Sequence, residues 1–123
     1  MSMHRLKATE ISENELAQEI KRLVQEAEKL FGQSLCKVVQ FGSSLGGASS
    51  MHLYSDIDLC VILKSGTSHK DYYGRLPIST LIPVDWILAN KDEFEEKSLR
   101  RHGVFHLINC EGKTLLDKSH GKI

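Results

Sequence analysis

Two aspartates lie inside one apolar run, in the stretch SDIDLCVIL of residues 55–63. Side chains alternate across a β-strand, so Asp56 and Asp58 would share one side, roughly 6 to 7 Å apart. Ile57 and the apolar residues at every second position after it would share the other side. Because burying a carboxylate costs free energy unless a positive partner meets it, the pattern predicts a strand with core on one side and cation-binding chemistry on the other.

The other patterns predict a succession of helices and strands. An amphipathic helix is expected over residues 11–32, with Ser12 and Glu15 as a capping box and Gly32 as its stop. The remaining predicted elements are strands at 34–42, 56–63 and 79–90, a helical segment at 91–112 interrupted near Gly103, and a last short strand at 113–117. Pro83 favours an edge or an irregular start for the third strand. We therefore expect one α/β domain over residues 1–123, of α+β type, with residues 1–8 as a loose tail.

A third aspartate, Asp85, stands between the apolar residues Val84 and Trp86. If its strand lies beside residues 56–63, three carboxylates converge, and their repulsion would raise the pKa of at least one of them. Hard divalent cations such as magnesium prefer oxygen ligands and would offset this repulsion. The three aspartates therefore predict a two-metal site suited to phosphoryl transfer.

A Gly-Ser turn ends the strand that precedes the aspartates. Gly42 would let the backbone approach a ligand closely, and Ser43 with the following amides would open a helix whose N-terminus receives phosphate oxygens. Gly46 and Gly47 keep the turn free of side chains. This stretch therefore predicts a phosphate-binding turn beside a metal-binding strand.

Gly42-Ser43, followed after twelve residues by Asp56-Ile57-Asp58 and then by VDWIL, resembles the nucleotidyltransferases of the DNA polymerase beta superfamily. With the ending EGKTLLD, the chain is similar to the minimal nucleotidyltransferases of prokaryotes. The resemblance implies a small mixed β-sheet flanked by helices. The family usually has ten residues where this chain has twelve, which implies a longer loop around residues 48–54. A basic residue commonly follows the Gly-Ser pair, where Ser44 and Leu45 stand here.

The resemblance also implies roles for the motif residues. Gly42 and Ser43 would bind a nucleoside triphosphate, and Asp56 and Asp58 would hold two magnesium ions. Asp85 would share a metal and help to activate the attacking hydroxyl. The implied reaction moves a nucleoside monophosphate, AMP from ATP, onto a hydroxyl. Small family members are often antitoxins that modify a tyrosine of a helical HEPN-type ribonuclease toxin, so such a protein is the implied partner.

Two alternatives stay open at this point. The first is an antibiotic-type nucleotidyltransferase, which would need a dimer to supply the second domain that a chain of 123 residues lacks. The second is a nucleotide-binding antitoxin that acts by contact alone, although such a protein has no physical need for paired charges on a strand. The apolar residues Phe94, Leu99, Val104 and Phe105 exceed what one helix face needs and predict a surface for a helical partner.

Three other features have weaker functional interpretations. His102 and His106 are four residues apart and could bind one metal, but no third ligand is apparent, so surface or core histidines are favoured. The loop at residues 69–75 contains His69, Lys70, Tyr72, Tyr73 and Arg75 and could stack a base and hold phosphate. Trp86 is expected in the core.

Composition limits the partners and the environment. Lysine plus arginine equal aspartate plus glutamate at 16 each, so neither a nucleic acid nor an anionic membrane is implied as an obligatory partner. The three widely spaced cysteines, Cys36, Cys60 and Cys110, predict reduced, buried thiols rather than disulfides or a zinc site. No apolar run has signal-peptide or membrane-spanning character, so a soluble cytoplasmic protein is expected. The sequence leaves open whether the chain forms oligomers.

Overall fold

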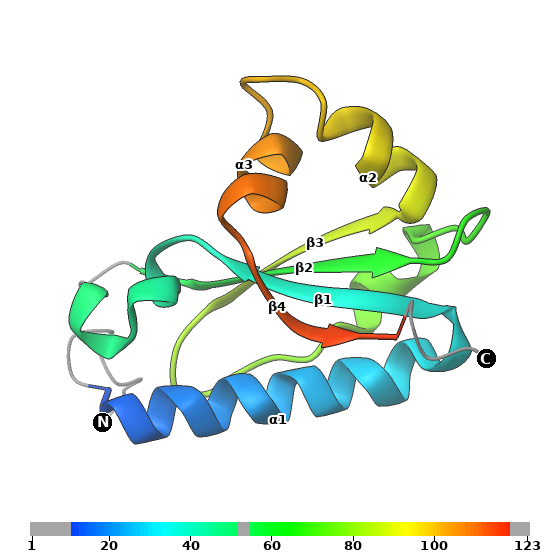
Figure 1. Cartoon of the computed structure of the whole chain (residues 1–123). Coiled ribbons are helices and arrows are strands. Elements are labelled where there is room, and N and C mark those ends of the chain that lie inside the picture. The colour runs from blue at the N-terminus through cyan, green and yellow to red at the C-terminus, as the bar shows by residue number, and fades with distance from the viewer. Residues whose placement is uncertain (1–10, 52–54, 119–123) are drawn as a thin grey trace.

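The structure is a computed structural model that describes residues 11–51 and 55–118. Its helices are α1 (Glu13–Phe31), α2 (Lys91–Lys97) and α3 (Val104–Glu111), and its strands are β1 (Leu35–Phe41), β2 (Ile57–Leu63), β3 (Val84–Asn90) and β4 (Lys113–Asp117) (Figure 1). Short 3-10 turns lie in the connections: η2 (Gly32–Ser34), η3 (Ser43–Gly46), η4 (Ala48–Ser50) and η5 (Lys70–Arg75). The helices and strands expected over residues 11–42, 56–63 and 79–117 are thus confirmed, whereas the expected tail at residues 1–8 lies outside the described residues.

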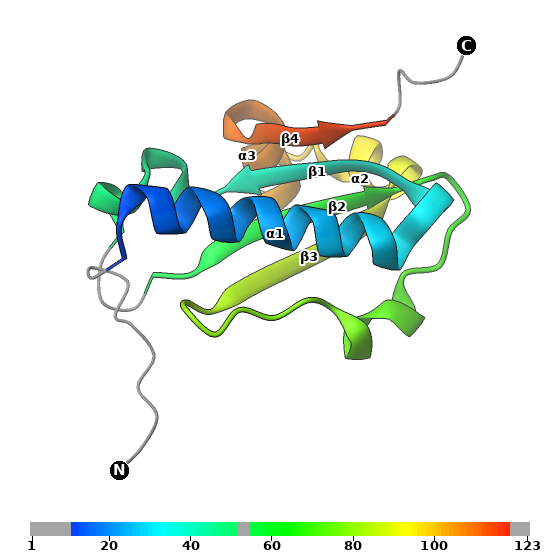
Figure 2. The same cartoon turned by 90° about the horizontal axis from the view of Figure 1, so that it is seen from below.

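The four strands form one mixed sheet in the order β3-β2-β1-β4. β1 runs antiparallel to both β2 and β4, while β2 and β3 are parallel. Figure 2 shows α1 lying across one face of this sheet. Pro83 immediately precedes the edge strand β3, as predicted, so its missing N–H leaves no gap in the ladder. The mixed sheet with helices on both faces confirms the expected α+β class.

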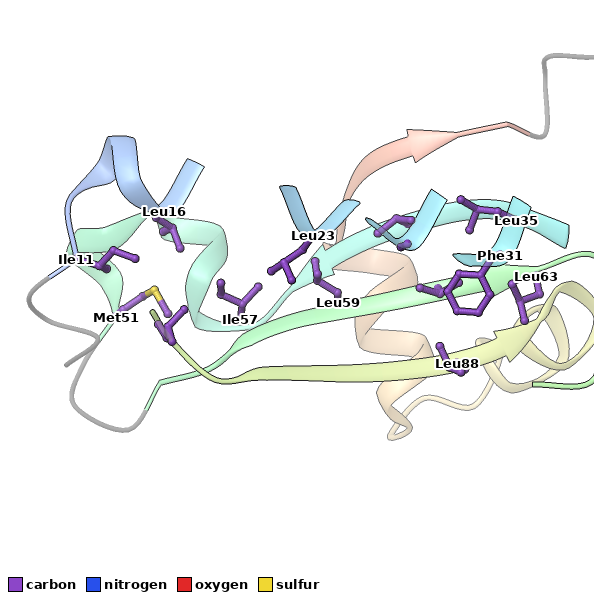
Figure 3. Packing of buried hydrophobic residues seen from close by; sticks show 14 residues of the cluster. Ile11, Leu16, Leu23, Phe31, Leu35, Met51, Ile57, Leu59, Leu63 and Leu88 are labelled. Atoms are coloured by element: carbon purple, nitrogen blue, oxygen red, sulfur yellow. The ribbon is translucent and has the colours of Figure 1, made fainter. Parts of the chain in front are cut away.

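Helix α1 forms for the local reasons that its sequence indicates. The Glu15 N–H donates to Ser12 Oγ and the Ser12 N–H donates to Glu15 Oε1, both at 3.0 Å, which completes the predicted capping box. Gly32 ends the helix with a φ of +56°. The buried side chains of α1 pack on the residues of β2 that point to this face, namely Ile57, Leu59, Val61 and Leu63 (Figure 3).

The opposite face of the sheet is covered by α2 and α3. Cys60 and Ile62 of β2 are buried there, against Ile108 of α3. Phe94 and Phe105 pack edge to face above them, with ring centroids 5.6 Å apart. The prediction that this whole side of β2 serves chemistry was therefore wrong beyond Asp58. The helical segment is interrupted between α2 and α3, so that α3 folds back over the sheet. Phe94 and Phe105 consequently belong to the core rather than to a partner surface.

The cysteine prediction is confirmed in part. Cys36 and Cys60 are free and buried, whereas Cys110 is free but exposed. Cys110 lies on the outward face of the short helix α3, so its apolar neighbours in sequence do not surround it in space. Among the described helices, none combines the length and apolar character needed to cross a membrane.

Gly112 tests how closely the turn between α3 and β4 packs on β1. A Cβ atom added there would lie 2.5 Å from the Ile108 carbonyl oxygen and 2.5 Å from Val39 Cγ1. We expect Gly112→Ala to lower the free energy of unfolding by about 1–3 kcal/mol because of this overlap. Gly74→Ala is the control, since nothing lies within 4 Å of its added Cβ. Equal urea midpoints for the two variants would contradict the packing of this turn.

Candidate active site

Asp58 and Asp85 lie side by side on neighbouring parallel strands. The ladder between β2 and β3 pairs Ile57 with Val84, Asp58 with Asp85 and Leu59 with Trp86. Ile57, Leu59 and Trp86 all contact the core beneath α1. Strand alternation therefore directs both aspartates to the opposite face, at the end of the sheet where β2 and β3 begin. The expected neighbourhood of the strands is confirmed.

The carboxylate of Asp58 has a raised pKa. It is half-buried, and burial, together with the nearby charges of Asp85 and Asp56, raises its pKa to about 6. Asp56 is also half-buried, whereas Asp85 is exposed. The prediction that at least one carboxylate of the cluster would have a raised pKa is confirmed, and all three contribute to one electrostatic site.

The Gly-Ser turn lies directly against Asp58. Phe41, the last residue of β1, pairs with Asp58 across the ladder, and the chain then turns at Gly42 with a φ of +78°. A Cβ atom at Gly42 would overlap the carboxylate of Asp58, with the carboxyl carbon only 3.0 Å away. Glycine is therefore required here both for the left-handed backbone and for the space.

After Gly42 the chain forms a short turn, where the sequence predicted a helix. Ser43 begins the four-residue 3-10 turn η3, in which the Leu45 N–H donates to the Gly42 carbonyl at 3.1 Å. A second turn, η4, follows, so the long loop contains 3-10 turns; residues 52–54 of the expected longer loop lie outside the described residues. The helix prediction was wrong because Gly46 and Gly47 disfavour helical backbone and end the turn before an α-helix can form.

Two contacts of this loop were not foreseen from the sequence. Buried Gln40 donates from Nε2 to the Oγ atom of buried Ser44 at 2.8 Å, which ties the end of β1 to η3. Glu13 accepts the backbone N–H groups of Ala48 and Ser49 at 2.9 and 3.2 Å. The sequence identifies Glu13 only as an acid in a first helical turn, since backbone partners leave no side-chain pattern.

The other candidate residues lie away from the aspartates. The loop at residues 69–75 follows the end of β2 that lies away from Asp58 (Figure 1). The Tyr72 ring packs there on Phe31, with ring centroids 4.7 Å apart, and the base-stacking interpretation of this loop stays a prediction. Trp86 donates from Nε1 to the Pro77 carbonyl at 2.8 Å and packs on the core, as predicted. His102 is exposed, and His106 Nδ1 lies 2.9 Å from the Ser98 carbonyl oxygen.

The aspartate site does not provide a complete set of metal ligands from the described side chains. In the part of the chain that the structure describes, no three acidic, histidine or cysteine side chains form a ready metal-binding group. Any cation held by Asp58 and Asp85 would therefore take further oxygen ligands from water or from a bound phosphate. A separate cavity of about 390 Å³ lies on the other face of the sheet, between α1, η3 and β4, and is distinct from the aspartates.

Comparison with known protein families identifies the chain. The family described as nucleotidyltransferase domain matches residues 20–110, a segment that contains the Gly-Ser turn and all three aspartates. Among curated proteins, none matches the chain. Because the family match covers most of the chain and the fold has the expected mixed sheet, the resemblance seen in the sequence is confirmed: the chain belongs to the nucleotidyltransferase domain family.

Proposed function

We propose that the chain transfers a nucleoside monophosphate, AMP from ATP, onto a hydroxyl of a partner protein in a magnesium-dependent reaction at Asp56, Asp58 and Asp85. The observation that carries this proposal is the placement of Asp58 beside Asp85 in register, with Gly42 against the Asp58 carboxylate. Carboxylate oxygens can bind the metal ions of a metal-bound triphosphate, and a glycine turn lets backbone N–H groups approach its phosphates.

Carboxylate donors of this kind suit two magnesium ions, whose remaining ligands would come from water and the triphosphate. Asp58 has a pKa of about 6 because burial and its acidic neighbours disfavour its charge, and a divalent cation would reverse that effect. Asp56, just before β2, and Asp58, within it, would bind the cations together with Asp85 of β3. When bound, magnesium neutralises charge on the triphosphate and on the leaving pyrophosphate.

The protein residues then have separate tasks. The turn at Gly42 and Ser43 receives the triphosphate, because Gly42 presents no side chain and the first N–H groups of a helical turn have no partner within that turn. Asp85 is exposed at the edge of the sheet, so an acceptor hydroxyl can reach its carboxylate, which orients the hydroxyl and takes its proton. The hydroxyl oxygen then bonds to the α-phosphorus, and the bond to pyrophosphate breaks.

A protein acceptor is supported by the apolar surface between α2 and α3. Leu99 is 81% exposed, and Val104 and Leu107 are also exposed. Unpaired apolar side chains of this kind favour contact with another protein. We propose a helical HEPN-type ribonuclease as the partner and a tyrosine hydroxyl as the acceptor, as the family resemblance implies, in the cytoplasm and without nucleic acid.

Transfer should depend on the paired aspartates. Asp58→Asn and Asp85→Asn should each lower AMP transfer by at least about 100-fold, because each removes a charged oxygen ligand of the magnesium ions that would neutralise the reacting phosphates. The measurement is transfer of label from α-labelled ATP, with magnesium, to the HEPN-type partner or to proteins of a cell lysate. Asp92→Asn is the control, since that carboxylate accepts from the Ser65 hydroxyl at 2.9 Å in the segment after β3, away from the site. Activity within a few-fold of wild type in both site variants would exclude the assignment.

Stability should depend on pH through Asp58. Its folded pKa of about 6 lies above the value of a free aspartate, so the stability it contributes is present below about pH 4 and is lost as the pH rises through 6. Asp58→Asn removes this dependence and should gain about 1 kcal/mol relative to wild type between pH 4.5 and pH 7.5, solvent screening included. Urea unfolding in EDTA measures it; parallel pH profiles for the two proteins would refute the raised pKa.

Magnesium with ATP should stabilise the folded protein. A ligand that binds only the folded state adds about 2.7 kcal/mol at 100 times its dissociation constant, which raises the melting temperature by several degrees in a domain of this size. The Asp85→Asn variant should lose most of that increase. A thermal-shift titration of correctly folded wild-type protein that shows no increase with magnesium and any of the four ribonucleoside triphosphates would argue against a working metal site.

A further inference from the structure

The loop after the Gly-Ser turn is held by a side chain near the beginning of the described chain. Glu13, in the first turn of α1, accepts the N–H of Ala48 with Oε1 at 2.9 Å and the N–H of Ser49 with Oε2 at 3.2 Å. Each carboxylate oxygen thus has its own backbone donor. The two contacts join residue pairs that are 35 and 36 positions apart in sequence.

The backbone at this point is the N-terminal end of the 3-10 turn η4. Gly47 precedes this turn with a φ of +83° and a ψ of −175°, and the first N–H groups of the turn, those of Ala48 and Ser49, donate to Glu13. A Cβ atom at Gly47 would lie 2.6 Å from Glu13 Oε1, so a larger residue would push the carboxylate out. The contact therefore requires both the glycine and the acid.

The start of η4 is connected to the Gly-Ser turn through η3, which has two overlapping turn hydrogen bonds. The Gly47 N–H donates to the Ser44 carbonyl at 3.0 Å, and the Leu45 N–H donates to the Gly42 carbonyl at 3.1 Å. Gln40 holds Ser44 from the side of β1, and Glu13 holds Ala48 and Ser49 from the side of α1. Since η3 and η4 are consecutive short turns, fixing residues 47–49 also limits the motion of residues 42–45.

We propose that Glu13 is a positioning residue, which holds the loop at residues 42–49 in the conformation that receives the triphosphate. This inference rests on the proposed function of the Gly-Ser turn. Glu13 does not touch the nucleotide; it acts through the backbone of η4 and η3. Removing the carboxylate should loosen the loop before any nucleotide binds and should weaken nucleotide binding, because more loop freedom is then lost on binding.

Glu15 provides a matched control two residues away. Both glutamates lie in the first turn of α1, so both interact favourably with the helix dipole. Glu15 accepts the Ser12 N–H at 3.0 Å within the capping box, whereas Glu13 contacts the loop. A loss of helix stability should thus be common to Glu13→Ala and Glu15→Ala, and an effect on the loop should be specific to Glu13.

The first measurement is hydrogen exchange of the nucleotide-free protein. Glu13→Gln keeps the side-chain shape but presents an NH₂ group to one of the two N–H donors, so that hydrogen bond is lost. In Glu13→Gln and Glu13→Ala, the amides of residues 47–49 should exchange at least about tenfold faster than in wild type. Glu15→Ala should leave them unchanged. Equal exchange of these amides in the Glu13 and Glu15 variants would overturn the proposed contact.

The second measurement is the dissociation constant of MgATP, by calorimetric titration. Glu13→Gln should raise it about five- to tenfold, while Glu15→Ala should change it less than about twofold at similar melting temperature. Faster loop exchange without a change in MgATP affinity would overturn the positioning role. Absence of MgATP binding to the wild-type protein would instead reject the proposed function, and with it the positioning role, while the exchange data would still decide whether Glu13 holds the loop.

Discussion

The parallel register between β2 and β3 is the constraint on which the site depends. It sets Asp58 beside Asp85, two like charges on neighbouring strands, where repulsion and burial disfavour ionisation of Asp58. A slip of one residue would turn Asp85 toward the core beneath α1 and would bring Val84 and Trp86 out of it. The core residues that flank the aspartates therefore hold the two charges together. A slip of the strand register would relieve the charge repulsion, but it would also expose apolar side chains.

The sheet tolerates this arrangement because its two faces are unequally covered along β2. From Leu59 onward, the strand is buried by α1 on one face and by α3 on the other. Asp58 is only half-buried, and Phe41 of β1 and the Gly42 turn lie beside it. The stabilising burial and the unfavourable charge thus lie in different parts of one strand, which is a common compromise between stability and activity.

Much of the fold followed from local sequence rules. The period-2 pattern of residues 57–63 predicted which side chains of β2 share one core side, and the capping box with Gly32 predicted both ends of α1. The carboxylate cluster was predictable because side-chain types carry its chemistry. By contrast, the return of α3 over Cys60 and the exposure of Cys110 depend on how two short helices are oriented, and eight residues of α3 are too few for a clear periodic pattern.

The Gly-Ser loop was predicted only in part, because its contacts are made by the backbone. Glycines at 42 and 47 indicate that the chain turns, but not that η3 stays a 3-10 turn or that an acid from α1 accepts the N–H groups at the start of η4. Glu13 also precedes the matched family segment at residues 20–110, so family membership carries no information about it. Helix α1 consequently has two faces with two tasks: Leu16 and Leu23 bury the core, while the first turn reaches the loop. The strands β2 and β3 position the carboxylates, and helix α1 positions the loop that follows Gly42. Both parts of the site are therefore positioned by the core that α1 forms with the sheet.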